Sequence, residues 1–121
     1  MNPNLIPIAE FNKKLNKYLP YNLDYDVIYQ SLGLVKHIEK RHPDCVRYLN
    51  HLESIISTPD YIGVNPNEKG TSFELVKVFD QNIQIGIKLD IKDNYLYVAT
   101  LHSITESKLA HGLKNGRLKK I

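Results

Sequence analysis

The stretch SFELVKVFDQNIQIGIKLDIKDNYLYVATLHS, residues 72–103, decides the fold class of this chain. Apolar and polar residues alternate along it with a period of two, which is typical of β-strands that bury one face. Short polar turns at 80–82 and 92–94 divide the stretch into three segments. Connections this short join antiparallel neighbours, so the stretch predicts an antiparallel three-stranded meander.

The first part of the chain has the longer period of helices. A short amphipathic helix is predicted near 8–18, ended by Pro20, because its apolar residues recur at helical spacing. These residues are Ile8, Phe11, Leu15 and Leu19. Two short strands are predicted outside the meander, at 27–30 and 61–64.

Further helices are predicted on both sides of the meander. One covers 32–42, with Ser31 as its N-cap and Pro43 after its end. A second covers 45–57 and has one apolar face. A short helix follows the meander near 105–113.

Helices followed by an antiparallel sheet predict an α+β fold, with the helices packed on one face of one sheet of three to five strands. The 121 residues are enough for a single domain, 1–121, with one modest core. Its 42% hydrophobic and 24% charged residues are ordinary for a globular protein.

The compartment is predicted to be the cytoplasm. Cys45 is the single cysteine, so an internal disulfide is excluded and a reducing setting is expected. No run approaches the ~18 apolar residues of a membrane span, so no membrane partner is expected. The start, MNPNLIPIAEFNKK, lacks the apolar core of a signal peptide.

The segment HIEKRH, residues 37–42, gathers polar side chains on a predicted helix. His37 and Arg41 are four apart and share a flank at the border of the core, where an exposed helix face and a cleft are both consistent with the spacing. His42 falls within the apolar stripe and is interpreted as a buried histidine at the helix end. The two histidines face roughly 140° apart and cannot bind one zinc ion together, so no metal or other cofactor is expected.

Two polar positions in the strands stand out. Lys77 shares a face with Phe73 and Leu75, where an ammonium group is costly unless it is paired, lines a site or extends to the sheet edge. Strict alternation puts Thr100 and His102 on one face of the last long strand, together with Leu96 and Val98. Since a one-residue change in either turn swaps the faces, sequence does not place Lys77 and His102 on one surface.

The remaining chemistry is that of His, Lys, Arg, Thr and Ser without a metal ion. RNA suits such a site because its 2′-hydroxyl supplies the nucleophile for cleavage of the neighbouring phosphodiester. The protein then needs an acid or base that titrates near neutral pH, and cations beside the developing charge.

The segments HIEKRHPDC, PDYIG, FELVKVF, IGIKLD and YLYVATLHSITESKL, in this order, resemble the phage-type nuclease domains of the barnase–EndoU–colicin–RelE class. The resemblance covers a nuclease-like core at 27–118 and leaves 1–25 as an N-terminal helical extension. It implies N-terminal helices against an antiparallel sheet, and a toxin-like, metal-independent endoribonuclease of a phage or mobile element. The implied partners are an RNA (tRNA or mRNA) and a neutralising immunity or antitoxin protein.

The resemblance also implies a set of site residues. We expect His37 to act as general acid or base, and Arg41 and Lys77 as cations at the phosphate. The remaining candidates are His42, Thr100, His102 and Ser107. Basic residues expected to bind nucleic acid are Lys88, Lys108, Lys114, Arg117, Lys119 and Lys120.

Two alternatives stay open at this point. The same basic surface is consistent with a non-catalytic RNA- or protein-binding module of a mobile element, for which the Tyr-rich face of NYLYVATL, residues 94–101, would stack bases. The basic C-terminal segment, 114–120, either follows an RNA backbone or is a solvated end.

Overall fold

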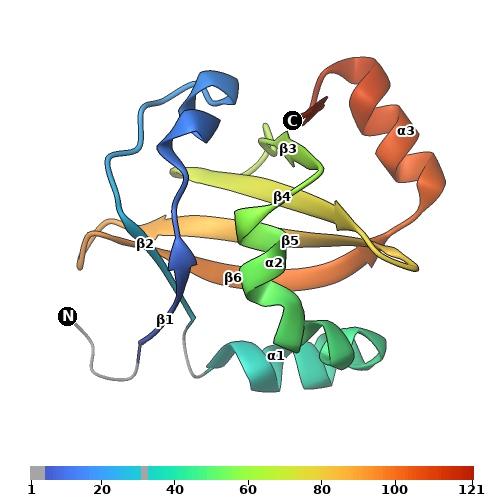
Figure 1. Ribbon diagram of the computed structural model, residues 1–121, viewed down its shortest axis with the longest axis horizontal. Helices are drawn as coiled ribbons and strands as arrows, with labels where there is room; N and C mark the ends of the chain where they lie inside the picture. The colour runs from blue at the N-terminus through green and yellow to red at the C-terminus, as the bar shows by residue number, and fades with distance from the viewer. Residues whose placement is uncertain (1–4, 31–32) are drawn as a thin grey trace.

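The computed structural model describes residues 5–30 and 33–121 of the chain. It confirms the α+β class: a seven-stranded mixed sheet has the strand order β1-β2-β6-β5-β4-β3-β7 (Figure 1). The strands are β1 (Ile6–Glu10), β2 (Val27–Gln30), β3 (Tyr61–Gly63), β4 (Ser72–Val78), β5 (Asn82–Asp90), β6 (Tyr95–Ile104) and β7 (Leu118–Lys120). The helices are α1 (Gly33–Arg41), α2 (Leu52–Ser57) and α3 (Glu106–Asn115), with 3-10 segments η1 (Lys13–Tyr18) and η2 (Pro43–His51).

The predicted meander is confirmed as the centre of the sheet. Strands β4, β5 and β6 pair antiparallel in sequence order. The two short strands predicted at 27–30 and 61–64 are also present: β2 pairs parallel with β6, and β3 pairs antiparallel with β4. The sheet is therefore wider than the predicted three to five strands, and one of its pairings is parallel.

The helix predicted at 8–18 is wrong. Residues Ile6–Glu10 form β1, which pairs antiparallel with β2, and a 3-10 segment follows at Lys13–Tyr18. Phe11 and Leu15 are buried in this conformation too, so their spacing does not discriminate between the two structures. Pairing with β2 satisfies the backbone of β1, and this contact between distant segments outweighs the local period.

The two helices predicted at 32–42 and 45–57 are confirmed in part. Helix α1 ends at Arg41, but the second segment begins as 3-10 helix at Pro43 and becomes α-helical only in α2. The predicted N-cap Ser31 lies outside the described residues. Over the parts of the chain that are described, no helix has the length and hydrophobicity needed to cross a membrane.

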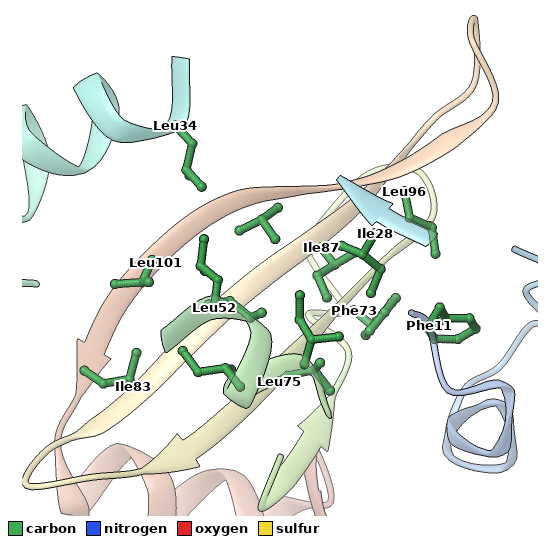
Figure 2. Close-up of a cluster of buried hydrophobic side chains, with 14 of the residues drawn as sticks. Phe11, Ile28, Leu34, Leu52, Phe73, Leu75, Ile83, Ile87, Leu96 and Leu101 are labelled. Carbon is green, nitrogen blue, oxygen red and sulfur yellow. The ribbon is translucent and has the colours of Figure 1, made fainter. Parts of the chain in front are cut away.

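The main core lies on one face of the sheet, beneath α1, α2 and η2 (Figure 2). Figure 2 shows that side chains from β4, β5 and β6 point toward those from the helices. Members of this core include Ile28, Leu34, Leu52, Phe73, Leu75, Ile83, Ile87, Leu96 and Leu101. A smaller core on the opposite face joins β4, α3 and β7 through Val76, Leu109 and Leu118.

A β-bulge in β6 corrects the predicted faces of that strand. Val98 pairs with Ile87 and Thr100 pairs with Gly86, so Ala99 is an extra residue without an opposite partner. A bulge of one residue reverses the alternation beyond it. Leu101 therefore enters the main core with Val98, and Thr100 and His102 lie on the other face, not with Leu96 and Val98 as predicted.

The basic C-terminal segment is not a free tail. Helix α3 ends at Gly116, whose φ of 81° lies in the left-handed region that glycine adopts without strain. The chain then reverses into β7, which pairs antiparallel with β3. The chain from Leu118 to Lys120 therefore belongs to the sheet, and the expectation that its cations contact an RNA backbone stays a prediction.

Asp80, in the turn between β4 and β5, connects this turn to η2. Arg47 Nη2 donates to Asp80 Oδ2 at 2.7 Å, and the Tyr48 hydroxyl donates to Asp80 Oδ1. The Tyr48 ring also packs against Phe79. The hydrogen bond from Tyr48, followed by that from Arg47, holds the pKa of Asp80 below its ordinary value.

We expect Tyr48→Phe to raise the pKa of Asp80 and to make the free energy of unfolding less dependent on pH. A carboxyl whose folded pKa is depressed stabilises the fold above its unfolded pKa, and this stabilisation is lost as the pH falls through the folded pKa. The variant should therefore be less stable than the parent at neutral pH, and the difference should shrink in strong acid. Urea unfolding against pH, with an NMR titration of Asp80, measures both changes.

The control for this test is Asp80→Asn, alone and combined with Tyr48→Phe. In the background of Asp80→Asn, the Tyr48→Phe difference should no longer change with pH. A pH-dependent difference that persists there would show that the Tyr48 hydroxyl does not act through Asp80.

Candidate functional site

A cleft of about 600 Å³ lies on the sheet face opposite the main core, between α3 and the loop before β4. Its floor comes from β5 and β6, because the bulge at Ala99 turns the polar residues of β6 to this side. Thr105 caps α3 by accepting a hydrogen bond from Lys108 N, and Asn82 on β5 donates to Glu106 at the start of α3. Polar residues that line the cleft include Gln84, His102, Ser107, Lys108, His111 and Arg117.

The sheet face that carries the cleft has two rows of residues across β4, β5 and β6, and Gln84 and His102 of the second row line the cleft. One row pairs Glu74 with Gly86 and Gly86 with Thr100, and the next row includes Gln84 and His102. Neighbouring strands lie about 4.8 Å apart, so the backbones of Glu74 and Thr100 are about 10 Å apart. Gly86 lies between them and has no side chain, and the Thr100 hydroxyl occupies the space over it, 2.7 Å from where a Cβ would lie.

Glu74 is the acidic residue of this site. Its side chain is only 14% exposed. One carboxylate oxygen accepts from Arg117 Nη2 at 2.8 Å, and the other accepts from Gln84 Nε2 at 2.7 Å. Both oxygens are thus held in place, one by Gln84 on β5 and the other by Arg117 just before β7.

Sequence reasoning missed Glu74. A charged residue on the outward face of an antiparallel strand is ordinarily a solvated one, so Glu74 alone carries no signal. A usable signal was the set of polar residues Glu74, Gln84 and His102 on the outward positions of three consecutive strands. That signal required knowledge of the bulge, because strict alternation put His102 on the other face.

His102 lies at the border between the cleft and α1. Its Nδ1 is 3.1 Å from the carbonyl oxygen of Ser103. When Nδ1 carries the proton and donates to that carbonyl, Nε2 is the ring nitrogen left for a substrate. The His102 ring is half-buried, so it is both oriented by the protein and within reach of solvent.

The other two predicted histidines form a row that leads to His102. The ring centroids of His42 and His102 are 5.5 Å apart, and those of His37 and His42 are 6.3 Å apart. His42 lies at the end of α1, as predicted, but it is half-buried rather than buried, and its backbone N–H donates to the Ile38 carbonyl oxygen. His37 is exposed on α1, as is Arg41 at the last position of that helix.

Lys77 does not join His102. It shares the core face with Phe73 and Leu75, as predicted, but its Nζ donates to the Thr58 carbonyl oxygen at 2.7 Å and to Thr58 Oγ1 at 3.0 Å. Thr58 is the C-cap of α2, so this lysine satisfies the end of a helix at the edge of the core. The two residues lie on opposite faces of the sheet and cannot contact one phosphate together.

The predicted nucleic-acid-binding cations are spread over several surfaces. Lys108 and Arg117 line the cleft, where Ser107 also lies. Lys88 forms an ion pair with Glu68 at 2.8 Å on the same sheet face. Lys119 lines a separate depression of about 270 Å³ beside η1, and Lys114 and Lys120 are exposed.

The titratable side chains do not form a metal site in the described part of the chain. Within 5–30 and 33–121, no three His, Cys, Asp or Glu side chains are grouped so that they could hold an ion. Cys45 is buried in the main core, and this burial is the main cause that raises the pKa of its thiol. The cleft is instead lined by an imidazole, a guanidinium and an ammonium, with the Glu74 carboxylate bonded to two of its lining residues, Gln84 and Arg117.

A protein-family model described as phage-Barnase-EndoU-ColicinE5/D-RelE like nuclease3 matches residues 7–111. The match begins within β1, ahead of the predicted nuclease-like core at 27–118, and it includes the strands that carry Glu74, Gln84 and His102. No curated protein and no solved structure matches the chain significantly.

We expect Gly86→Ala to destabilise the fold by about 1–3 kcal/mol, as overpacking does. A Cβ at this position would lie 2.7 Å from Thr100 Oγ1, which is too close for either atom to remain in place. Thr100→Ala removes that oxygen, so the double variant should regain most of the lost stability. Urea unfolding of the four proteins gives the coupling energy between the two sites.

Gly33→Ala is the matched control, because nothing lies within 4 Å of a Cβ built there. It should leave stability unchanged or slightly raised. Additive effects of Gly86→Ala and Thr100→Ala would contradict the close approach across β5 and β6.

Proposed function

The chain belongs to the family of phage Barnase–EndoU–ColicinE5/D–RelE-like nucleases, and from this premise we propose that it is a metal-independent endoribonuclease. In this proposal, a ribose 2′-hydroxyl attacks the adjacent phosphate within the cleft between α3 and the sheet. The products are a 2′,3′-cyclic phosphate and a 5′-hydroxyl end.

One observation supports this reaction above others: Glu74 and His102 lie on the same sheet face and are linked by Gln84, which lines the cleft. Glu74 lies on β4 and His102 on β6, and Gln84 on the intervening β5 donates to Glu74 and is the cross-strand partner of His102. Transfer of a phosphoryl group in line needs a base on one side of the phosphorus and an acid on the other. The spacing of two strands leaves room for one phosphate between them.

The proton steps follow from this placement. Glu74 accepts the proton of the 2′-hydroxyl as its oxygen bonds to phosphorus. His102, entering as imidazolium, gives its proton from Nε2 to the 5′-oxygen as the phosphorus–oxygen bond breaks. The cyclic phosphate keeps its single negative charge. At the end of the step Glu74 carries one more proton and His102 carries one fewer.

Cations of the cleft stabilise the charge that develops on the phosphate. Arg117 presents a fork of five N–H donors, so its guanidinium can bridge Glu74 and a phosphate oxygen. Lys108 lies on the α3 wall of the same cleft and acts as a second, more mobile cation. Thr100 and Ser107 supply hydroxyl groups that orient the substrate.

We assign the proton transfer to His102 rather than to the earlier candidate His37. His102 lines the cleft and has one ring nitrogen held by a backbone carbonyl, whereas His37 is exposed on α1. His42 lies between the two and positions His102 through ring contact. Lys77 is left out of the chemistry because it is bonded to Thr58 on the other face.

The biological setting follows as part of the same proposal. The substrate is tRNA or mRNA in the cytoplasm, and the exposed cations Arg41, Lys114, Lys119 and Lys120 attract its backbone from outside the cleft, with Lys88, paired with Glu68, contributing less. A toxin-like ribonuclease also requires a neutralising partner in the cell that makes it. The alternative function, a non-catalytic binding module, uses the same surface without turnover.

We expect His102→Ala to lower the rate of RNA cleavage at saturating substrate by about 10²- to 10⁴-fold, the range for loss of a general acid. His37→Ala should have a much smaller effect, and His51→Ala, an exposed histidine on η2, serves as the control. Single-turnover cleavage of a labelled RNA, with identification of the cyclic phosphate end, measures the chemical step.

The same assay tests the mechanism. Cleavage should persist in EDTA and should fail on an RNA with a 2′-deoxy ribose at the cleaved position. Loss of activity on chelation, or cutting of the deoxy substrate, would show that the mechanism is wrong. Salt-dependent binding of RNA that stays intact would favour the binding module instead.

A further inference from the structure

Three tyrosines form a connected group on the sheet face that also carries the cleft. Tyr29 lies on β2, and Tyr95 and Tyr97 lie on β6. The rings of Tyr29 and Tyr95 meet edge to face, with centroids 5.9 Å apart, and those of Tyr95 and Tyr97 are 5.7 Å apart. In the parallel ladder of β2 and β6, Tyr29 is the register partner of Tyr97, so both side chains point to one face.

One ring of the group is buried and the other two are partly accessible to solvent. Tyr95 is 9% exposed and supports the other two rings. Tyr29 and Tyr97 are half-buried, which leaves part of each open to solvent. Rings fixed in this way lose little conformational entropy when they bind a flat partner, because their neighbours already restrict them.

The tyrosine group lies on the same sheet face as the cleft, further along β6. Ala99 is the extra residue of the bulge, so Tyr97 before it and Thr100 after it lie on the same face of β6. The separation of Tyr97 from Thr100 along the strand is about 10 Å at the rise of a β-strand. A chain whose phosphate lies beside the Thr100 hydroxyl therefore reaches the tyrosines with a neighbouring nucleotide.

The charge around the tyrosines is balanced. Lys88, the cross-strand partner of Tyr97, is paired with Glu68 at 2.8 Å. Aromatic stacking is sequence-tolerant and does not need a net positive charge, since every base has a π-face. The tyrosine group thus offers a flat apolar surface for a base, and the cations of the cleft offer charge for the phosphate backbone of the same RNA strand.

We propose that Tyr29 and Tyr97 form a stacking platform for an unpaired RNA base next to the cleaved phosphate, so that the substrate is single-stranded there. The proposal rests on the proposed function for the position of the phosphate. In a double helix the bases are stacked on each other and closed to a side chain, whereas bases of loops and single strands can stack on tyrosine.

The test measures binding of a short single-stranded RNA to the full chain carrying His102→Ala, which prevents cleavage. Tyr97→Leu and Tyr29→Leu should each weaken binding by about 5- to 150-fold, the equivalent of one stacked base. Tyr97→Phe and Tyr29→Phe keep the ring and should retain affinity. Thermal unfolding of each variant identifies any loss of affinity that comes from misfolding. If a Leu variant misfolds, the Phe variants still test the proposal, because they keep the ring and should retain affinity.

An RNA in which single nucleotides are abasic locates the contact. One abasic position should weaken binding to the parent chain, and the same substitution should have no further effect on Tyr97→Leu. A duplex of the same sequence should bind more weakly than the single strand.

The outcomes separate this proposal from the proposed function. Leu variants that bind as tightly as the parent, or a preference for duplex, would overturn the platform even if the enzyme cleaves RNA normally. Tyrosine-dependent binding of single strands by a parent chain that never cleaves them would support the platform and reject the ribonuclease. Leu variants that lose affinity for a protein partner but not for RNA would assign the tyrosines to that partner and also overturn the proposal.

Discussion

One extra residue in β6, Ala99, decides which side chains of the last long strand enter the core and which line the cleft. Without it, the alternation that buries Leu96 and Val98 would also bury Thr100 and His102 and would expose Leu101. With it, Leu101 is fully buried and His102 lies opposite Gln84 on the other face. Bulges re-aim side chains at the cost of one unpaired residue, and here the whole polar floor of the cleft depends on that change.

The sequence predicted the parts of the fold in which pattern and length agree. The three long strands have enough residues for a period of two to be unambiguous, and α3 has a capping residue at Thr105. The N-terminal segment was misassigned because Phe11, after β1, and Leu15, in a 3-10 segment, are buried as readily as they would be on an α-helix. Strands of three to five residues, such as β1 and β7, are defined by their partners rather than by their own pattern.

The candidate site was predicted in composition more than in arrangement. Thr100, His102, Ser107, Lys108 and Arg117 were selected from the sequence, and all five lie on or around one sheet face. Lys77 was correctly recognised as a charge that needs a partner on an apolar face, but the partner is Thr58, nineteen positions earlier. Nothing local in the sequence reports a contact of that kind. Glu74 was missed for the opposite reason, because its surroundings in sequence are ordinary and its importance comes from Arg117 and Gln84.

The pairing of β7 with β3 has a consequence for the order in which the protein is made. Ribosomes release a chain from its N-terminus, so the meander that holds Glu74 and His102 emerges before the segment that follows α3. Arg117 can reach Glu74 only after β7 has joined β3, a contact between segments more than fifty positions apart in the sequence. Contacts of such long sequence separation form late because closing the intervening loop costs entropy. A nascent chain therefore holds the carboxylate and the imidazole without their guanidinium, and the cleft acquires its full charge only when this last strand has left the ribosome.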